Sequence, residues 1–244
     1  MPLPLHRLNE FIRLDRAEAE AFSALAVERR EFGRHGVIRR EGALAREVYF
    51  LVEGWAACRV ETATGDQQIA KVHLPGDLLG APSLALAKAG ETLVALTRVA
   101  VDVIPARRLG ALFSTSPRLA AALFFAAQQE RVFLMDRLAS IGRTSAAQRL
   151  VAFLLSLHDR LMKLDPDMEP RFELPLSQQQ LADVLGITTV HANRTFRQLD
   201  QSGLIRRSGR EIALEDVDEL RRFCGMPRRD FRKIQSWLPP RPAE

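Results

Sequence analysis

Side chains able to hydrogen bond to an anionic polymer are concentrated between residues 177 and 210 of this chain. Five arginines lie between Gly186 and Arg210, and Asp200 is the one acid in that interval. Threonine, histidine, asparagine and glutamine residues stand among the arginines. Guanidinium groups bind phosphates and the guanine edge, whereas amides and hydroxyls bind other base edges and the sugar-phosphate backbone. The segment therefore offers the chemistry of nucleic-acid binding.

Two short helices joined by a tight turn are predicted to present these side chains. Ser177 and Gln180 form an S-x-x-Q capping box, which marks a helix start, and Gly186 supplies the left-handed residue that ends this helix. Thr188 is placed to cap a second helix, which we expect to end at Gly203. The apolar face of the second helix consists of Ala192, Phe196 and Leu199. Such a helix suits the DNA major groove, and the alternative is a helical hairpin with a solvated basic face.

A small hairpin is predicted directly after the second helix. Residues 204–206 and 211–214 are short strand-like runs, and the Ser208-Gly209 pair between them has turn chemistry. In such a wing, Arg207 and Arg210 would contact phosphates and fix the register on DNA without reading its sequence. The alternative is an exposed, charged hairpin that only covers the core.

The second helix carries the side chains that we expect to read bases. Arg194 can bond guanine O6 and N7 in bidentate fashion, and Val190 can touch a thymine methyl group. Thr189 can either touch a thymine methyl group or accept a hydrogen bond from cytosine N4. Asn193 can pair with adenine or face the phosphates, and His191 contacts either DNA or solvent. The residues predicted to contact DNA are Ser177, Gln178, Thr188, Thr189, Val190, His191, Asn193, Arg194, Arg197, Arg207 and Arg210.

The composition agrees with this interpretation but does not require it. The chain has 244 residues and a net charge of +5, which is compatible with a nucleic-acid partner. Cys58 and Cys224 suit a reducing compartment, and two cysteines cannot supply the four ligands of a zinc or iron–sulfur site. The N-terminus lacks the apolar core of a signal peptide, and the most apolar run, residues 119–127, is far shorter than a membrane span of about 20 residues. We expect a cytoplasmic protein without a metal site.

Motifs typical of enzymes are missing from the sequence. It contains no Ser-His-Asp order, no glycine-rich phosphate loop and no pair of histidines at metal-binding spacing. We therefore expect no catalytic activity.

The first half of the chain changes character along its length. Residues 1–30 are predicted to be helical, whereas short apolar runs separated by glycine and proline predict strands at 48–52, 57–60, 68–74 and 94–104. This pattern favours a small antiparallel barrel or sandwich, which can hold one small ligand or be filled by side chains.

Residues 117–141 are predicted to form one long helix that pairs two copies of the chain. The first half of this helix is apolar almost all round, so it needs both its own barrel and a second partner surface. A helix buried within one domain is the alternative. The predicted dimer seam follows 3.5-residue spacing and consists of Phe124, Ala127, Arg131, Leu134, Leu138 and Ile141. Gly142 breaks the helix and marks the expected domain boundary.

The order of barrel, long helix and winged helix-turn-helix resembles the CRP/FNR family of bacterial transcription regulators. The resemblance rests on residues 52–54 (VEG), 74–80 (LPGDLLG) and 174–205 (LPLSQQQLADVLGITTVHANRTFRQLDQSGLI), and it covers residues 15–222. It implies an α+β fold with a β-roll (jelly-roll-like) sensor domain. The expected divisions are the sensor domain at 1–116, a dimerisation helix at 117–141, a winged helix-turn-helix domain at 142–224 and a flexible basic tail at 225–244.

Departures from the family pattern bear on the effector. Cyclic-AMP-responsive members carry Glu after the glycine that follows the PGD turn and Arg-Ser further on, whereas this chain has Ala81-Pro82 and Glu91-Thr92 there. A carboxylate repels the cyclic phosphate, so cyclic AMP is disfavoured. Residues 1–57 contain no cysteine for an iron–sulfur cluster, and His73, the one candidate for a haem ligand, is expected to alternate outward on a strand. A pocket for any other effector is expected at Gly80, Ala81, Pro82, Ser83, Glu91 and Thr92.

The sequence leads to the hypothesis of a homodimeric transcription regulator that binds a palindromic operator and is controlled by an unidentified effector in the β-roll. Its expected partners are double-stranded DNA, a second copy of the chain and RNA polymerase, with no membrane. Val190 stands where members that read TGTGA- or TTGAT-like half-sites carry Glu, so the operator should keep the guanine read by Arg194 and differ at the base pair that Glu would read. The alternatives are an effector-independent regulator and a small-molecule-binding module whose C-terminal domain contacts protein.

Overall fold

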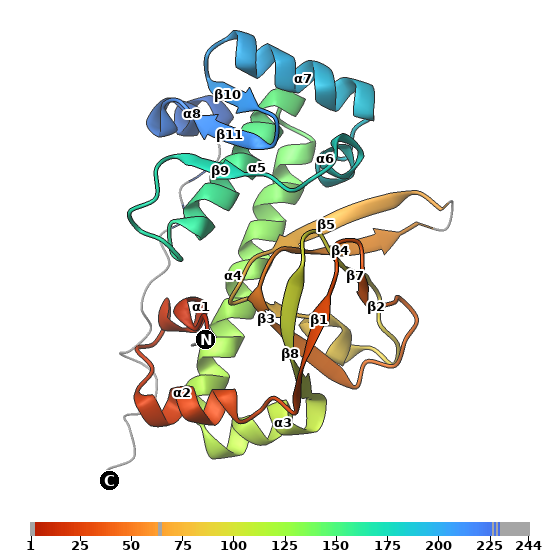
Figure 1. The fold of residues 1–244 in the computed structure, drawn as a ribbon, viewed down its shortest axis with the longest axis vertical. Coiled ribbons are helices and arrows are strands. Elements are labelled where there is room, and N and C mark those ends of the chain that lie inside the picture. Colours follow the sequence, from red (N-terminus) through yellow and green to blue (C-terminus); the bar gives the residue numbers. More distant parts are fainter. Residues whose placement is uncertain (1–2, 63–64, 226, 228, 230–244) are drawn as a thin grey trace.

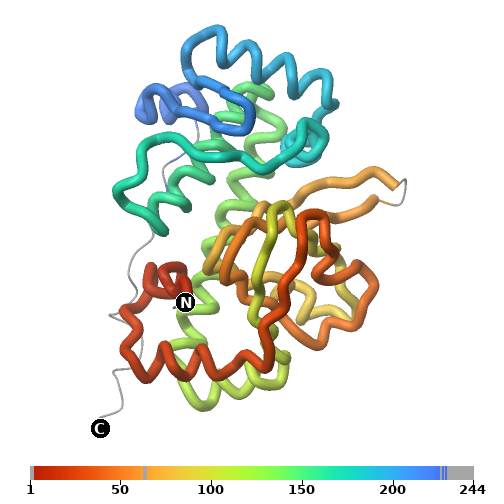
Figure 2. The backbone as a smooth tube through the Cα atoms, viewed as in Figure 1, coloured from red at the N-terminus to blue at the C-terminus, as the bar shows by residue number. Residues whose placement is uncertain are grey.

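The computed structural model describes residues 3–62, 65–225, 227 and 229. A two-sheet β-domain, one long helix and a smaller, mainly helical domain follow one another along the chain (Figure 1). The long helix, α4 (Pro117–Ile141), runs beside the β-domain and reaches the C-terminal domain, as the backbone tube in Figure 2 shows. This architecture confirms the predicted α+β fold class.

Two short helices precede the first sheet. They are α1 (His6–Asn9) and α2 (Arg16–Ser23), and α2 starts at a capping box in which Asp15 and Glu18 exchange hydrogen bonds. The chain is already in strand β1 (Glu28–Phe32) before residue 30, so the prediction of helix throughout residues 1–30 is wrong at its end. The predicted apolar positions of this segment are all buried: Leu8, Phe11, Ile12 and Leu25.

Two four-stranded antiparallel sheets form the β-roll. One sheet has the order β1, β8 (Val99–Pro105), β3 (Glu47–Glu53) and β6 (Leu78–Leu79). The other has the order β2 (Val37–Arg39), β7 (Thr92–Ala95), β4 (Ala56–Glu61) and β5 (Gln67–His73). The apolar run predicted as one strand over 94–104 is divided between β7 and β8, which belong to different sheets because the chain bends at residues 96–98.

Strand β3 is buried on both faces because it separates two cores. Val48, Phe50 and Val52 pack with the N-terminal helices, whereas Tyr49 and Leu51 pack in the interior between the sheets. Successive side chains of a strand point to opposite faces, so a strand between two cores is apolar at every position. This explains the continuous apolar run that the sequence shows there.

Helices complete the β-domain. The helix α3 (Ala106–Thr115), which was not predicted from the sequence, follows β8 directly and contacts α4. Pro117 occupies the first turn of α4, where its missing N–H costs nothing, and Gly142 is the C-terminal cap residue. A 3-10 helix, η1 (Ala81–Ala85), follows β6.

Up to residue 225, the C-terminal domain contains a three-stranded sheet and four helices. Its elements are α5 (Ala146–Leu161), β9 (Arg171–Glu173), α6 (Gln178–Leu185), α7 (Thr189–Gln201), β10 (Ile205–Ser208), β11 (Glu211–Leu214) and α8 (Val217–Cys224). Nearly all of the predicted flexible tail, residues 225–244, lies outside the described residues.

Arg137 of α4 connects the β-domain to the end of α6. Ala70 has no partner in the β4–β5 register, where a bulge interrupts the ladder. The Arg137 guanidinium donates to the carbonyl of Ala70 at 2.6 Å, to that of Ile69 at 3.2 Å and to that of Val184 near the end of α6. Gln68 of β5 donates to the carbonyl of Asp183. Carbonyls at a helix end lack partners within the helix, so these donors satisfy them and fix α6 against the β-domain.

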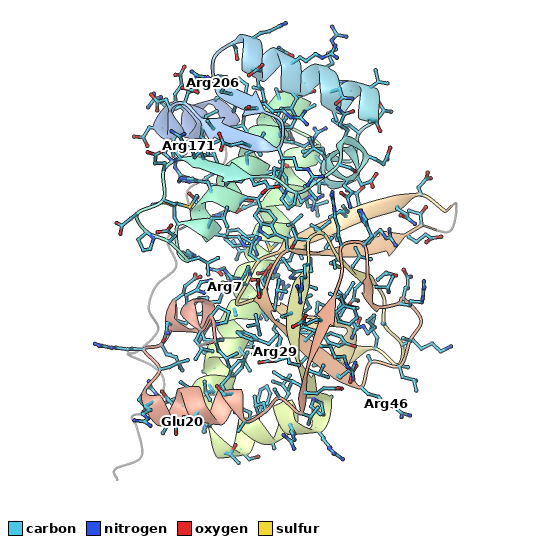
Figure 3. All side chains as sticks on the ribbon, in the orientation of Figure 1. Arg7, Glu20, Arg29, Arg46, Arg171 and Arg206 are labelled. Atoms are coloured by element: carbon cyan, nitrogen blue, oxygen red, sulfur yellow. The ribbon has the colours of Figure 1, made fainter. Side chains whose placement is uncertain are left out.

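A buried ionic cluster joins the N-terminal helix to both domains around Asp77. Arg160 Nη2 lies 2.5 Å from the Asp77 carboxylate, and Arg7 and Lys71 each lie 3.3 Å from it. Arg7, labelled in Figure 3, extends from α1 towards α4. Burial opposes ionisation of Asp77, but the surrounding cations outweigh it and hold the pKa of Asp77 well below its usual value.

The same cluster contains His73, and the prediction that His73 faces outward is wrong. His73 is buried, with Nδ1 3.2 Å from the Asp77 carboxylate. Burial and the Lys71 charge lower the pKa of His73 to about 4. The outward prediction fails because α4 and α5 supply side chains that cover the end of β5.

Candidate nucleic-acid interface

Helix α6 begins and ends where the sequence predicts. Ser177 Oγ accepts from the backbone N–H of Gln180 at 3.1 Å, and Gln180 Oε1 accepts from the backbone N–H of Ser177 at 2.8 Å. Gly186 caps the other end with a φ of 66°, which favours glycine. The predicted capping box and C-terminal glycine are both confirmed.

Helix α7 starts at the predicted cap and buries the predicted face. Thr188 Oγ1 accepts from the backbone N–H of His191 at 3.3 Å. The buried residues of this helix are Ala192, Thr195, Phe196 and Leu199, so the apolar face is confirmed. The helix ends at Gln201, slightly before the left-handed Gly203 that was predicted to end it.

The opposite face of α7 is turned to solvent at the end of the molecule farthest from the N-terminal helices (Figure 1). Val190 is 80% exposed, which is the largest exposure among the exposed large apolar side chains of the described chain. His191, Arg194 and Arg197 are exposed, and Thr189 and Asn193 are half-buried. Within the described chain, neither the Arg194 nor the Arg197 side chain has a hydrogen bond or an ion pair.

Two side chains of α7 are held by glutamines of α6. Thr189 Oγ1 donates to Gln179 Oε1 at 2.6 Å, and Asn193 Nδ2 donates to Gln178 Oε1 at 2.8 Å. Gln179 in turn donates from Nε2 to Asp183 Oδ1 at 2.8 Å. The bonds of Thr189 and Asn193 could not be foreseen from the sequence, because they join residues of two helices whose crossing only the fold defines.

The wing is present, with a shorter turn than expected. β10 and β11 pair antiparallel from Ile205 opposite Leu214 to Ser208 opposite Glu211. Arg207 and Ser208 therefore belong to a strand and not to the turn. Gly209 has a φ of 61°, which is the left-handed conformation that a tight hairpin turn requires.

The arginines of the wing have internal partners. The Arg207 guanidinium lies 5.0 Å from the centre of the Phe196 ring, and its Nε donates to the carbonyl of Gly209 at 3.1 Å. Arg210 lies 3.8 Å from Glu173, and both side chains are more than half exposed. Such exposed pairs contribute little to stability, so the wing arginines can exchange them for phosphate oxygens at little cost.

The residues predicted to form an effector pocket surround a buried ion pair. Arg39 of β2 and Glu91 are both buried, and Arg39 Nη2 donates to the Glu91 carboxylate. Ser83 Oγ donates to the other oxygen of Glu91. The backbone carbonyl of Gly80 lies 3.5 Å from Arg39 Nη2. The structure therefore brings Gly80, Ser83 and Glu91 together around an arginine that no sequence signal distinguished.

The other predicted pocket residues do not join this ion pair. Thr92 Oγ1 accepts from the backbone N–H of Glu41 at 3.0 Å. Ala81 and Pro82 begin the 3-10 helix, and Pro82 is exposed.

The predicted dimer seam lies on the surface of the single chain. Its large apolar members are all more than half exposed: Phe124 (52%), Leu134 (53%), Leu138 (72%) and Ile141 (59%). Ala127 and Arg131, the other two seam positions, are exposed as well. Met135, which the heptad spacing did not include, is 60% exposed beside them. An apolar stripe of this kind on a long helix is typical of an interface with another helix.

Two further properties concern the described part of the chain. Within it, no helix combines the length and apolar character that crossing a bilayer requires. Its histidine, cysteine, aspartate and glutamate side chains form no group of three or more that could hold a metal ion.

The fold and this surface define a winged helix-turn-helix protein with an additional β-roll domain. A model of the Crp-like helix-turn-helix domain matches residues 148–223, and a model of the cyclic nucleotide-binding domain matches residues 29–116. Both matched segments coincide with the domains described above.

Individual relatives agree with the two domain matches. The transcriptional activatory protein AadR of Rhodopseudomonas palustris is 31% identical over 190 residues, which cover 78% of this chain and 77% of AadR. The nitrogen fixation regulation protein FixK of Azorhizobium caulinodans is 30% identical over 230 residues, 91% of each chain. The solved structure of FixK2 from Bradyrhizobium japonicum superposes with a TM-score of 0.71 at 26% identity, covering 80% of this chain and 96% of FixK2.

This chain belongs to the CRP/FNR family of transcription regulators. It is a DNA-binding regulator of transcription with an N-terminal sensor-type domain, and the resemblance noted in the sequence is confirmed. The relatives are regulators and not enzymes, which confirms the expectation that the chain has no catalytic function.

Proposed function

We propose that this regulator binds a palindromic operator as a homodimer and reads each half-site through the exposed face of α7. The observation that carries the proposal is that one helix presents both an 80% exposed Val190 and an Arg194 side chain without a partner among the described residues. Exposing a large aliphatic side chain to water is unfavourable, and a thymine methyl group in the major groove would cover it. The neighbouring guanidinium is free to bond guanine O6 and N7.

The remaining interface residues have supporting roles in this proposal. Thr189 and Asn193 face base edges beside Val190, and His191 contacts a base or the backbone. The residues assigned to phosphates or to positioning are Ser177, Gln178, Thr188, Arg197, Arg207 and Arg210. Phosphate contacts set the register, whereas base contacts set the sequence.

The exposed seam of α4 supports the homodimer. Leu134, Leu138 and Ile141 follow the heptad spacing and are exposed in one chain, so a second copy would bury them. A two-fold axis along this helix would place the two α7 helices in successive major grooves, about 34–36 Å apart. The operator would then have two inverted half-sites.

The experiment is a selection of bound duplexes from a randomised library, carried out with the wild type and with Arg194→Ala. We expect an inverted repeat whose base pair opposite Val190 differs from that of a TGTGA half-site. Arg194→Ala should cost about 1–3 kcal/mol and relax the preference for one guanine. The control is Arg171→Ala, which removes an equally charged side chain on β9, away from α7 (Figure 3). Recovery of an ordinary TGTGA half-site, or an unchanged consensus with Arg194→Ala, would contradict the proposal.

We infer that the β-roll does not bind cyclic AMP. Buried Arg39 is already neutralised by Glu91, and Ser83 holds the second oxygen of that carboxylate. An anionic ligand bound to Arg39 would displace Glu91 and leave it buried without a counter-charge, which costs several kcal/mol. A regulator controlled by its own abundance, or by an uncharged effector, agrees better with these contacts.

The other family cofactors are also disfavoured in this proposal. The imidazole of His73 is engaged with Asp77, which does not suit a haem ligand. Residues 1–57 contain no cysteine to bind an iron–sulfur cluster. The test for cyclic AMP is thermal unfolding with and without a saturating amount, because a ligand that binds the native state raises its melting temperature. We expect no shift, and a rise of several degrees would contradict the inference.

RNA polymerase is the further partner that we propose, since relatives of this chain are described as transcriptional activators. Because the regulator works on chromosomal DNA, we propose a cytoplasmic location.

A further inference from the structure

The hydrogen-bond chain from α6 to α7 ends at a base-reading position. Asp183, Gln179 and Thr189 are linked in series, with 2.8 Å between Gln179 Nε2 and Asp183 Oδ1 and 2.6 Å between Thr189 Oγ1 and Gln179 Oε1. Thr189 is the first residue of α7 and precedes the exposed Val190. The chain therefore runs from a charged group in the supporting helix to the start of the helix proposed to enter the groove.

Each link of this chain has a fixed direction. A carboxylate at neutral pH accepts hydrogen bonds only, so the side facing Asp183 must be the NH₂ group of the Gln179 amide. The amide is planar, and its oxygen therefore points away from Asp183, towards Thr189. An amide oxygen also only accepts, so the Thr189 hydroxyl has to donate its single proton to Gln179.

The consequence concerns what Thr189 can offer to DNA. A hydroxyl has one donor and two acceptor positions, and the donor is used inside the protein. Towards the groove, Thr189 can present only lone pairs and its methyl group. In the major groove, the hydrogen-bond donors are adenine N6 and cytosine N4, whereas guanine O6, guanine N7 and thymine O4 are acceptors.

We propose that Asp183 and Gln179 are positioning residues that make Thr189 an obligate hydrogen-bond acceptor, so that it selects a base with an amino group in the major groove, which is adenine or cytosine. This inference rests on the proposed role of α7 in the major groove and adds to it a specific chemistry at one base pair. Asp183 and Gln179 themselves touch no base. They determine the preference through the orientation of one amide and one hydroxyl.

The experiment uses the full-length protein and the same randomised duplex library. Thr189→Val has the same shape but no acceptor, so the preference for adenine or cytosine at one position should fall roughly twofold to tenfold, the value of one hydrogen bond. Asp183→Asn can donate as well as accept, which allows the Gln179 amide to turn over and donate to Thr189. The Thr189 proton is then released, and guanine or thymine should become acceptable at the same position.

A matched control separates this effect from a general change in charge. Asp167→Asn removes the same charge in the exposed loop after α5 and should leave base preferences unchanged. Thermal unfolding of each variant shows whether it is folded.

The relay of hydrogen bonds from Asp183 through Gln179 to Thr189 is overturned, while the proposed function stands, if Thr189→Val keeps the wild-type preference or if Asp183→Asn leaves that preference as narrow as before. Failure of the wild type to bind any duplex overturns the relay together with the proposed function. The relay alone is also overturned if the wild type binds DNA and reads a guanine through Arg194 but shows no preference for adenine or cytosine at a further position.

Discussion

The contact between Arg137 and the end of α6 leads to a measurable prediction about how the domains are held together. Arg137→Met keeps a long side chain and removes every donor. The carbonyls of Ala70, Ile69 and Val184 would each lose the guanidinium bond. Ala70 has no strand partner, and Val184 lies in the last turn of α6, so neither of these two carbonyls regains a partner within its own element.

The magnitude follows from these carbonyls. The Ala70 carbonyl is left without a partner, which costs about 1–3 kcal/mol, whereas the Val184 carbonyl keeps Gln68 Nε2 at 3.4 Å and loses about 1 kcal/mol, so the two carbonyls set a range of about 2–4 kcal/mol. In the wild type, burial of the guanidinium lowers the pKa of Arg137 and offsets part of the stability that these hydrogen bonds contribute. We therefore expect Arg137→Met to lower the free energy of unfolding by about 2–3 kcal/mol.

The assay combines urea unfolding with hydrogen exchange. The midpoint of unfolding should fall, and the backbone amides of α6 should exchange faster, because this helix loses its attachment to α4. The matched control is Arg143→Met, which changes an exposed arginine just beyond the end of α4 and should be neutral. Equal stability of the two variants, with unchanged exchange in α6, would refute the reasoning.

Three further predictions concern the seam, the sensor domain and acid sensitivity. Leu138→Asp should convert the dimer to a monomer in analytical ultracentrifugation, whereas Leu164→Asp at another exposed leucine should not. A monomeric wild type would contradict the predicted dimer interface on α4. Glu91→Gln leaves a buried guanidinium without its counter-charge and should lower the free energy of unfolding by about 3–5 kcal/mol in urea, and a neutral variant would contradict the buried ion pair. His73 has a pKa of about 4 in the folded protein and 6.5 in the unfolded chain, so the unfolded state binds more protons between these values. The contribution of His73 to the free energy of unfolding is complete above pH 6.5 and falls by about 3 kcal/mol as the pH drops to 4. In unfolding curves measured at a series of pH values, His73→Gln should remove this dependence on pH.

Helices α6 and α7 could be predicted because their signals are local. The capping box at Ser177, the glycine cap at Gly186 and the cap at Thr188 each depend on residues within a few positions of one another. The apolar face of α7 and the seam of α4 are likewise periodic patterns along one helix. Local hydrogen bonds and helical periodicity are therefore sufficient to place these residues on a buried or an exposed face of their helix.

Other elements were missed where the local signal was weak or contradicted by packing. Gly110 interrupts the helical pattern of α3, which forms because Leu109 and Leu112 pack into the core beneath α4. The run over 94–104 looks like one strand, although its two halves serve different sheets. His73 was placed outward because strands usually alternate, and covering groups from other elements reverse that expectation.

By itself, the sequence determined the family, the order of the domains and the side chains that line the exposed face of α7, since periodicity and end caps act over a few residues. Only the tertiary structure decided which of those side chains are free and which are engaged. Glu91 meets Arg39 across 52 positions, and Thr189 meets Gln179 across the crossing of two helices. Such pairs depend on the placement of whole elements in the core, and the chemistry of a side chain towards a ligand depends on the partner that this placement gives it.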